Sequence, residues 1–377
     1  EARVDDGYRV VGWGAAPPEA AGVAKRHGLQ GPLHDAFLSR FVVTYGTRGS
    51  AAETARNRED ALRFCAEWNN WMCLHWGWDK LPKNRAHNWF EPPYPFRPGP
   101  YIPADQPLML PIRDTEITGE HIARANLVLF GDPKTHALLH EIRDRLPLRL
   151  GSGSVSTGNR AYAGPSVNYT LVAPNPLNPR RYVVVSRGYL SSRIDPVKNS
   201  PSTVGKDLEA LPFYWPDYVV WDGARKPSRT VQAPFVYLPE TYLEAGFFDE
   251  GWKLDEDPPA TTAFVSLADP QGPSPALQEP KEPFAGPVEV ALVAEDRPGG
   301  FGVAYTEYRL DGAPWVRYEA PFRVDRPGVH VLEYRSVDRC GRFVYEVAEG
   351  RNRGRDAEGN PEPVRRLSFT IRPPGGG

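Results

Sequence analysis

Short runs of apolar residues, each ending in Gly, Asp or Ser, recur along the first two thirds of the chain. Four of them stand at residues 41–46, 127–132, 182–186 and 218–222. Unbroken apolar runs of this length are typical of strands buried on both faces. Segments with a helical pattern separate them, at residues 51–75, 119–125, 133–146 and 204–211. This alternation predicts an α/β domain with a mostly parallel sheet flanked by helices.

Beyond Trp252 the pattern changes to strands alone. Candidate strands lie at 261–267, 288–293, 304–310, 329–337 and 367–371. Their spacing, with turn pairs such as Asp311-Gly312, predicts an all-β, immunoglobulin-like sandwich. The polar stretch 349–363 is expected to be a loop. The predicted divisions are an N-terminal strand segment 1–16, an α/β domain 17–252, a Pro-rich linker with the first sandwich strand 253–285, and the sandwich 286–377.

The first segment, residues 3–14, alternates well enough to form a strand, although no partner strand lies near it in the sequence. Such a strand can pair within its own domain or add to the sheet edge of another subunit. The second alternative predicts a homo-oligomer and, in its fullest form, a polymer built by strand addition.

Charge and hydropathy exclude two classes of partner. The chain has 45 basic and 47 acidic residues, a net charge of −2, and therefore lacks the basic excess expected for binding nucleic acid. No stretch reaches the roughly 20 apolar residues of a membrane helix, so no transmembrane segment is predicted. The chain starts at Glu1 without Met, and we expect it to be processed or excerpted from a longer precursor.

Open α/β sheets bind ligands at the carboxyl ends of their strands. This rule makes Tyr45, Gly46, Thr47, Asp132 and Ser186 the ligand-binding candidates. The Gly-x-Ser-x-Gly nucleophile motif is absent, so no catalytic residue is assigned. The favoured function is a non-catalytic binding or assembly module. The alternative is a serine-type hydrolase, acting on an ester or a peptide through Thr47, Ser186 or Asp132.

Tryptophan is concentrated in one segment. Five of the ten tryptophans fall within 22 residues: Trp68, Trp71, Trp76, Trp78 and Trp89. Flat aromatic surfaces can stack on sugar rings or anchor a protein partner, and this predicts a glycan as an alternative ligand. A long loop pinned to its own domain by these rings is the competing interpretation.

Two sets of residues have metal-ligand character. His136 and His140 are four apart on a predicted helix, but without the His-Glu-x-x-His order we expect an exposed helix face rather than a metal site. In the sandwich, Asp296 and Asp338, near the Gly299-Gly300 turn, offer oxygen ligands for calcium. No other cofactor is predicted.

The sandwich segment carries a family resemblance. Residues 286–292 (GPVEVAL), 306–312 (TEYRLDG) and 330–338 (HVLEYRSVD) resemble the Omp-type immunoglobulin-like repeat of secreted bacterial enzymes and surface proteins. The match covers about 115 residues and departs from the repeat after Asp338. The resemblance implies an extracellular or cell-surface location and a spacer or adhesive role.

A second resemblance covers most of residues 1–252. Residues 27–37 (HGLQGPLHDAF), 43–47 (VTYGT) and 126–133 (NLVLFGDP) resemble the region that follows the hydrolase domain in large secreted prolyl-oligopeptidase-like proteins of bacteria. The resemblance implies that this chain is the non-catalytic C-terminal part of such a protein.

Overall fold

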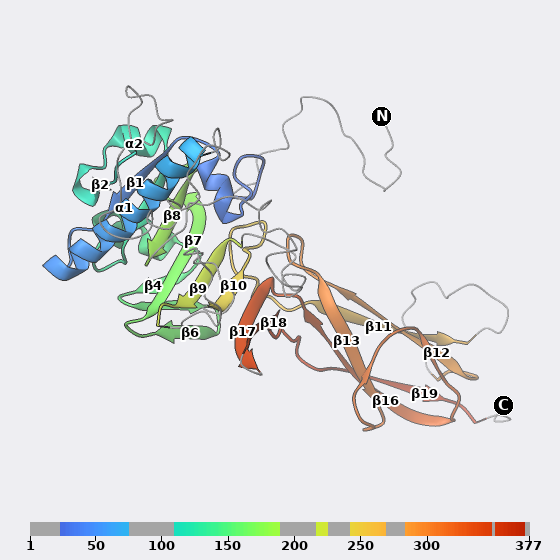
Figure 1. The fold of residues 1–377 in the computed structure, drawn as a ribbon. Helices are drawn as coiled ribbons and strands as arrows, with labels where there is room; N and C mark the ends of the chain where they lie inside the picture. The colour runs from blue at the N-terminus through green and yellow to red at the C-terminus, as the bar shows by residue number, and fades with distance from the viewer. Residues whose placement is uncertain are drawn as a thin grey trace, which may run out of the picture.

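The computed structural model describes residues 23–74, 109–188, 216–224, 242–268, 283–348 and 351–373. The predicted N-terminal strand segment 1–16 lies outside these residues. The described chain forms two units, a first unit built on a large mixed sheet and a sandwich that follows it (Figure 1). Among the described residues, no helix has both the length and the apolar character needed to cross a membrane.

Nine strands make the large sheet, in the order β18-β17-β10-β9-β7-β8-β3-β1-β2. The pairs β2–β1, β1–β3 and β3–β8 are parallel, and the pairs from β8–β7 to β17–β18 are antiparallel. Their bounds are β1 (Phe41–Tyr45), β2 (Ile112–Arg113), β3 (Asn126–Phe130), β7 (Val167–Asn175), β8 (Asn178–Arg187), β9 (Tyr218–Asp222), β10 (Tyr242–Gly246), β17 (Arg342–Ala348) and β18 (Arg351–Asp356).

The predicted α/β fold with a mostly parallel sheet flanked by helices is therefore wrong. In the part of the chain that the structure describes, 45% of the residues are in strands and 16% in helices, with three α-helices. An apolar run is the same in a parallel and an antiparallel strand when both faces are covered, so the runs did not reveal strand direction. The connection between β7 and β8 spans only two residues, a length that permits an antiparallel pair but no parallel crossover.

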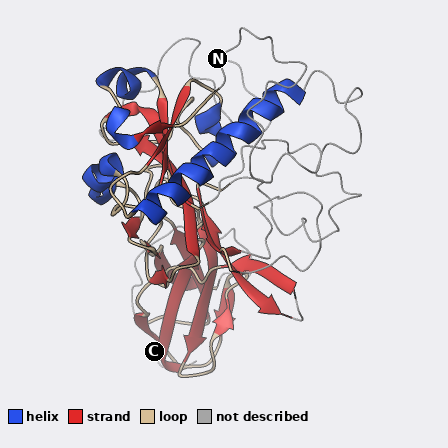
Figure 2. Cartoon of the chain, turned by 60° about the vertical axis from the view of Figure 1, so that its left-hand side comes forward, coloured by secondary structure: helices blue, strands red, loops and turns tan. Residues whose placement is uncertain are grey.

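One long helix packs on the sheet of the first unit. The helix α1 (Ala51–Leu74) lies across the strands (Figure 2), where its Phe64 contacts Phe130 at a ring distance of 5.8 Å and Trp68 meets Phe41 at 4.8 Å. The other elements of this unit are short: η1 (Leu33–Phe37), η3 (Asp114–Glu116), α2 (Gly119–Arg124), α3 (Ala137–Ile142), η4 (Arg143–Arg145) and the small sheet β4 (Arg149–Gly151), β5 (Ser154–Thr157), β6 (Arg160–Ala163).

Two sheets that share one apolar core make the second unit. The first sheet contains β11 (Ala260–Leu267), β12 (Val288–Glu295) and β15 (Phe322–Val324), and the second contains β14 (Val316–Arg317), β13 (Val303–Leu310), β16 (Gly328–Asp338) and β19 (Arg365–Ile371). Val290, Leu332 and Phe369 lie in their common core. This sandwich-like arrangement agrees with the β-sandwich that the sequence predicts.

The two units share strands. After β16 the chain returns to the first unit, where β17 pairs with β10 and places Val344 opposite Glu244. Residues 351–356, inside the stretch expected to be a loop, form β18 and pair with β17. The chain then re-enters the sandwich as β19. Pairing satisfies the backbone groups of this polar segment, which its side chains alone did not predict.

Candidate metal centre

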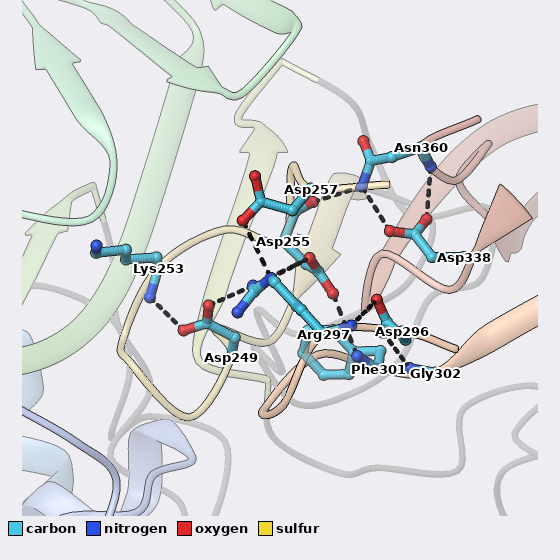
Figure 3. A network of polar contacts seen from close by, with 10 residues as sticks. All are labelled: Asp249, Lys253, Asp255, Asp257, Asp296, Arg297, Phe301, Gly302, Asp338 and Asn360. Atoms are coloured by element: carbon cyan, nitrogen blue, oxygen red, sulfur yellow. Dashed lines mark hydrogen bonds and ion pairs between the residues drawn. The ribbon is translucent and has the colours of Figure 1, made fainter. Parts of the chain in front are cut away.

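Three aspartates converge where the sandwich adjoins the first unit. Asp255 lies between β10 and β11, Asp296 follows β12, and Asp338 is the last residue of β16. Each offers a carboxylate oxygen, and these atoms all lie within 4.8 Å of one another (Figure 3). Asp255 and Asp338 are buried, and Asp296 is partly buried. The three residues can hold a metal ion.

One arginine provides the positive charge of this cluster. Arg297 places Nη2 2.6 Å from Asp249 Oδ2 and 3.0 Å from Asp255 Oδ1, while its Nε lies 3.2 Å from Asp257 Oδ2. Asp249 and Asp255 are buried, whereas the Asp257 side chain is 75% exposed. Among the described residues, neither Asp296 nor Asp338 has an ion-pair partner. The cluster therefore carries more negative charge than Arg297 offsets.

Neutral donors orient the three carboxylates. Gly302 N donates to Asp296 Oδ2 at 2.7 Å, and Phe301 N donates to Asp255 Oδ2 at 3.2 Å. Asn360 donates to both oxygens of Asp338, from its backbone N at 2.5 Å and from Nδ2 at 2.8 Å. A carboxylate has about four lone-pair sites, so each group keeps acceptor capacity for a further partner.

Burial raises the pKa of Asp255 and of Asp338 above 3.8, because it removes water from the charged carboxylates. Asp296 adds to both pKa shifts through like-charge repulsion. Hydrogen bonds from Phe301 N and Asn360 act in the opposite direction. The site therefore favours an added positive charge, either a proton or a cation.

The donor set and the local shape fit a hard cation. All three donors are carboxylate oxygens, which Ca²⁺ and Mg²⁺ prefer. Gly300 keeps the space beside two of these carboxylates free of a side chain. A Cβ at this position would lie 2.4 Å from Asp296 Oδ2 and 3.1 Å from Asp255 Oδ2. Gly359 permits a close backbone approach to Asp338, because a Cβ there would lie 2.0 Å from the Asp338 carbonyl oxygen and 2.6 Å from Oδ1.

Sequence reasoning found two of these three aspartates. Asp296 and Asp338 were candidates, and the structure brings them together. Asp255 was missed because it lies in the predicted linker, 41 residues before Asp296, where no ligand spacing marks it. The acidic run 255–257 (DED) was the one local signal available.

The predicted strand-end residues are neighbours at the ends of β1, β3 and β8. Tyr45 is buried, and Gly46 packs so tightly that a Cβ there would lie 2.4 Å from Thr135 O. Thr47 Oγ1 donates to Asp114 Oδ1 at 2.6 Å. The structure thus places these three residues in packing and turn contacts. Their ligand-binding role stays a prediction.

The other two strand-end candidates also have intramolecular partners. Asp132 Oδ1 accepts from the backbone N of residues 134 and 135, and its Oδ2 lies 3.6 Å from Arg187 Nε. Ser186 is buried and its Oγ lies 2.8 Å from Thr170 Oγ1. Among the described residues, no histidine is a hydrogen-bond partner of Ser186. The hydrolase alternative stays a prediction.

The two histidines do not share an exposed helix face, which corrects the expectation for His136. His136 is fully buried as the N-cap of α3, and its Nε2 lies 2.9 Å from Thr44 Oγ1. His140 is exposed, with Nδ1 3.1 Å from Pro133 O. The prediction started the helix at residue 133, but α3 starts at Ala137, so His136 precedes it and points inward.

The buried His136 predicts a loss of stability in acid. Burial lowers the pKa of His136 from 6.5 to about 4, because the charged ring loses its water. The unfolded chain binds this proton below pH 6.5 and the folded chain does not, so about 3 kcal/mol of stability is lost as the pH falls from 6.5 to 4. Urea unfolding of the wild type and of His136→Asn across this range measures the difference.

The His136→Asn variant keeps a good N-cap residue, and its stability is expected to vary less with pH than that of the wild type. The raised pKa values of Asp255 and Asp338 increase the stability of the folded chain as the pH falls, which is the opposite sign. Both proteins share this contribution, so it cancels in the difference between their stabilities. His140→Asn, at an exposed position of α3, is the matched control. Parallel profiles for the wild type and His136→Asn would contradict the prediction.

The tryptophan patch is described only in part. Trp68 is partly buried and packs on Phe37 and Phe41 in the core. Trp71 belongs to α1, with no description of its side chain, and Trp76, Trp78 and Trp89 lie outside the described residues. The glycan-binding prediction for this patch therefore stays a prediction.

Comparison of the chain with protein-family models, with curated proteins and with solved structures finds no match.

Proposed function

We propose that this chain is an extracellular, non-catalytic binding or assembly module whose two units are held together by a calcium ion. The observation that carries the proposal is the convergence of Asp255, Asp296 and Asp338 within 4.8 Å at the junction. Asp296 and Asp338 belong to the sandwich, while Asp255 comes from the segment that leaves the first unit. A cation bound to all three ties that segment to the sandwich.

Charge balance supports calcium at this junction. Arg297 already serves three carboxylates, and Asp296 and Asp338 have no ion-pair partner among the described residues. A divalent cation offsets their repulsion, and the backbone donors hold the carboxylates in place. Extracellular calcium modules bind with dissociation constants of roughly 10⁻⁴ to 10⁻³ M, a range suited to a site with three protein carboxylates.

The location and the assembly state belong to the same proposal. The resemblance of residues 286–338 to the Omp-type repeat supports an extracellular location and a spacer role. The alternating segment 3–14 supports self-association by strand addition. Electron microscopy of the full chain beside a chain lacking residues 1–16 tests this step, and filaments that disappear on truncation are the expected result.

Calcium is expected to stabilise the folded chain. With a dissociation constant of about 0.1 mM, 10 mM calcium raises the free energy of unfolding by about 2.7 kcal/mol relative to a chelator. Denaturant unfolding in 10 mM calcium and in chelator measures this shift. Mg²⁺ at the same concentration gives a smaller shift, because it dehydrates reluctantly and demands octahedral geometry.

Two variants locate the calcium effect. Asp338→Asn removes one ligand charge and is expected to abolish most of the stabilisation by calcium. Asp257→Asn removes an exposed carboxylate of the same neighbourhood that lies outside the three ligands, and it keeps the shift. No calcium shift in the wild type, or an equal shift in Asp338→Asn, would overturn the metal site.

A further inference from the structure

Arginines gather at the end of the large sheet where its parallel strands begin. Arg40 precedes β1 and its carbonyl accepts from Asn126 N, the first residue of β3. Arg180 and Arg181 lie near the start of β8, where Asn178 Nδ2 donates to the carbonyls of Ile122 and Ala123 in α2. These contacts place the three arginines at the end of the large sheet that adjoins α2.

The segment after α3 reaches the same end of the sheet. Arg145 Nη1 donates to the carbonyl of Pro176, in the turn that leads into β8, and Arg149 begins β4. We call the set Arg40, Arg145, Arg149, Arg180 and Arg181 the basic rim. All of them are exposed except Arg181, which is partly buried.

No carboxylate neutralises the basic rim among the described residues. Two acids of the neighbouring segments pair with other arginines, since Asp144 lies 3.5 Å from Arg143 Nη2 and Glu120 lies 3.4 Å from Arg124 Nη1. Five arginines without an ion-pair partner leave a local excess of positive charge, which an external anion would offset. The local positive charge contrasts with the net charge of −2 for the whole chain.

A groove adjoins the basic rim at Arg149 and could hold part of a ligand. It measures about 300 Å³ and is lined by Arg143, Asp144, Leu146, Leu148, Arg149 and Leu150. This volume is at the lower end of the range for small-molecule sites. Arg149 faces it without an ion-pair partner among the described residues, and leucines supply an apolar surface for ring carbons.

We propose that the basic rim and its groove bind an acidic polysaccharide, with carboxylate or sulfate groups on the arginines. Guanidinium forks match carboxylate and sulfate-like oxygens in a bidentate way, which lysines do not. The chain as a whole has a net charge of −2 and lacks the basic excess expected for binding nucleic acid, and this favours a polysaccharide over nucleic acid.

Binding of the full chain to polygalacturonate and to dextran sulfate tests the proposal, with neutral dextran and duplex DNA as comparison ligands. The first two separate carboxylate from sulfate recognition. The triple variant R149Q/R180Q/R181Q is expected to bind the preferred polymer about tenfold or more weakly. Its slope of log affinity against log salt is expected to be smaller by about 2 to 3.

The control variant R323Q/R326Q/R366Q removes the same charge from exposed positions of the sandwich. It is expected to bind like the wild type. An equal loss in both triple variants would show general charge attraction and overturn the site. The proposal is also overturned if neither acidic polymer binds, or if duplex DNA binds more tightly than both.

Discussion

Replacing Arg297 with methionine is expected to destabilise the folded chain by about 4 kcal/mol, because it leaves buried carboxylates without their cation. The side chains of Asp249 and Asp255 are only 3% and 0% exposed. Asp296 and Asp338 add further negative charge nearby, without an ion-pair partner among the described residues. The effect is larger than for a surface ion pair because water does not reach these oxygens.

Denaturant unfolding of the full chain measures this loss, and Arg323→Met is the control. Arg323 Nε also lies 2.5 Å from a carboxylate, that of Asp325, but both side chains are more than half exposed. The control is expected to lose less than about 1 kcal/mol. If the two variants lost equal stability, Arg297 would be no more than a surface partner. Calcium is expected to reduce the loss in Arg297→Met, since it restores positive charge to the cluster.

The sequence predicted the strands of the sandwich better than those of the first unit. In β12 and over most of β16, buried residues alternate with less buried ones because one face meets the core, and this alternation is local information. The runs that became β8 and β9 were also recognised as strands, but their direction depends on the partners they meet. The tight turn between β7 and β8 makes this pair antiparallel. An unbroken apolar run contains no signal for strand direction.

The candidate metal centre shows the same limit. Asp296 and Asp338 were found as oxygen donors near a glycine turn, but their third partner depends on how the segment after β10 crosses to the sandwich. This crossing is a matter of tertiary packing, and no spacing in the sequence encodes it. Residues 351–356 are polar and rich in arginine, yet they form β18 because β17 offers a ladder of backbone groups.

A chain that ends at residue 268 is expected not to fold, although it contains all but two strands of the large sheet. The missing β17 pairs with β10 through residues 342–344. Arg342 Nη1 donates to the carbonyl of Thr157 at 2.9 Å, and Tyr345 packs on Tyr242 at a ring distance of 5.2 Å. Removing these contacts opens the edge of β10 and exposes its buried residues to other chains.

The contacts that the truncation removes contribute a large part of the free energy of unfolding. Burial of one large aromatic side chain contributes about 2–3 kcal/mol, and a whole domain is stable by about 5–15 kcal/mol. Tyr345 is nearly buried and packs in a small apolar cluster with Val219 and Trp221. Losing Tyr345 from this cluster, together with the ladder and the Arg342 contacts, therefore leaves too little stability for a cooperative fold.

Near-UV circular dichroism and limited proteolysis compare the truncated chain with the full chain. The truncated chain is expected to lose its near-UV signal and to be digested rapidly. Adding residues 283–377 as a separate chain restores β17 and is expected to recover part of the protection. A truncated chain that unfolds cooperatively with a native near-UV spectrum would show that β17 is dispensable. The expected result instead makes the two units one folding unit, because the sandwich segment provides a strand that the first unit needs.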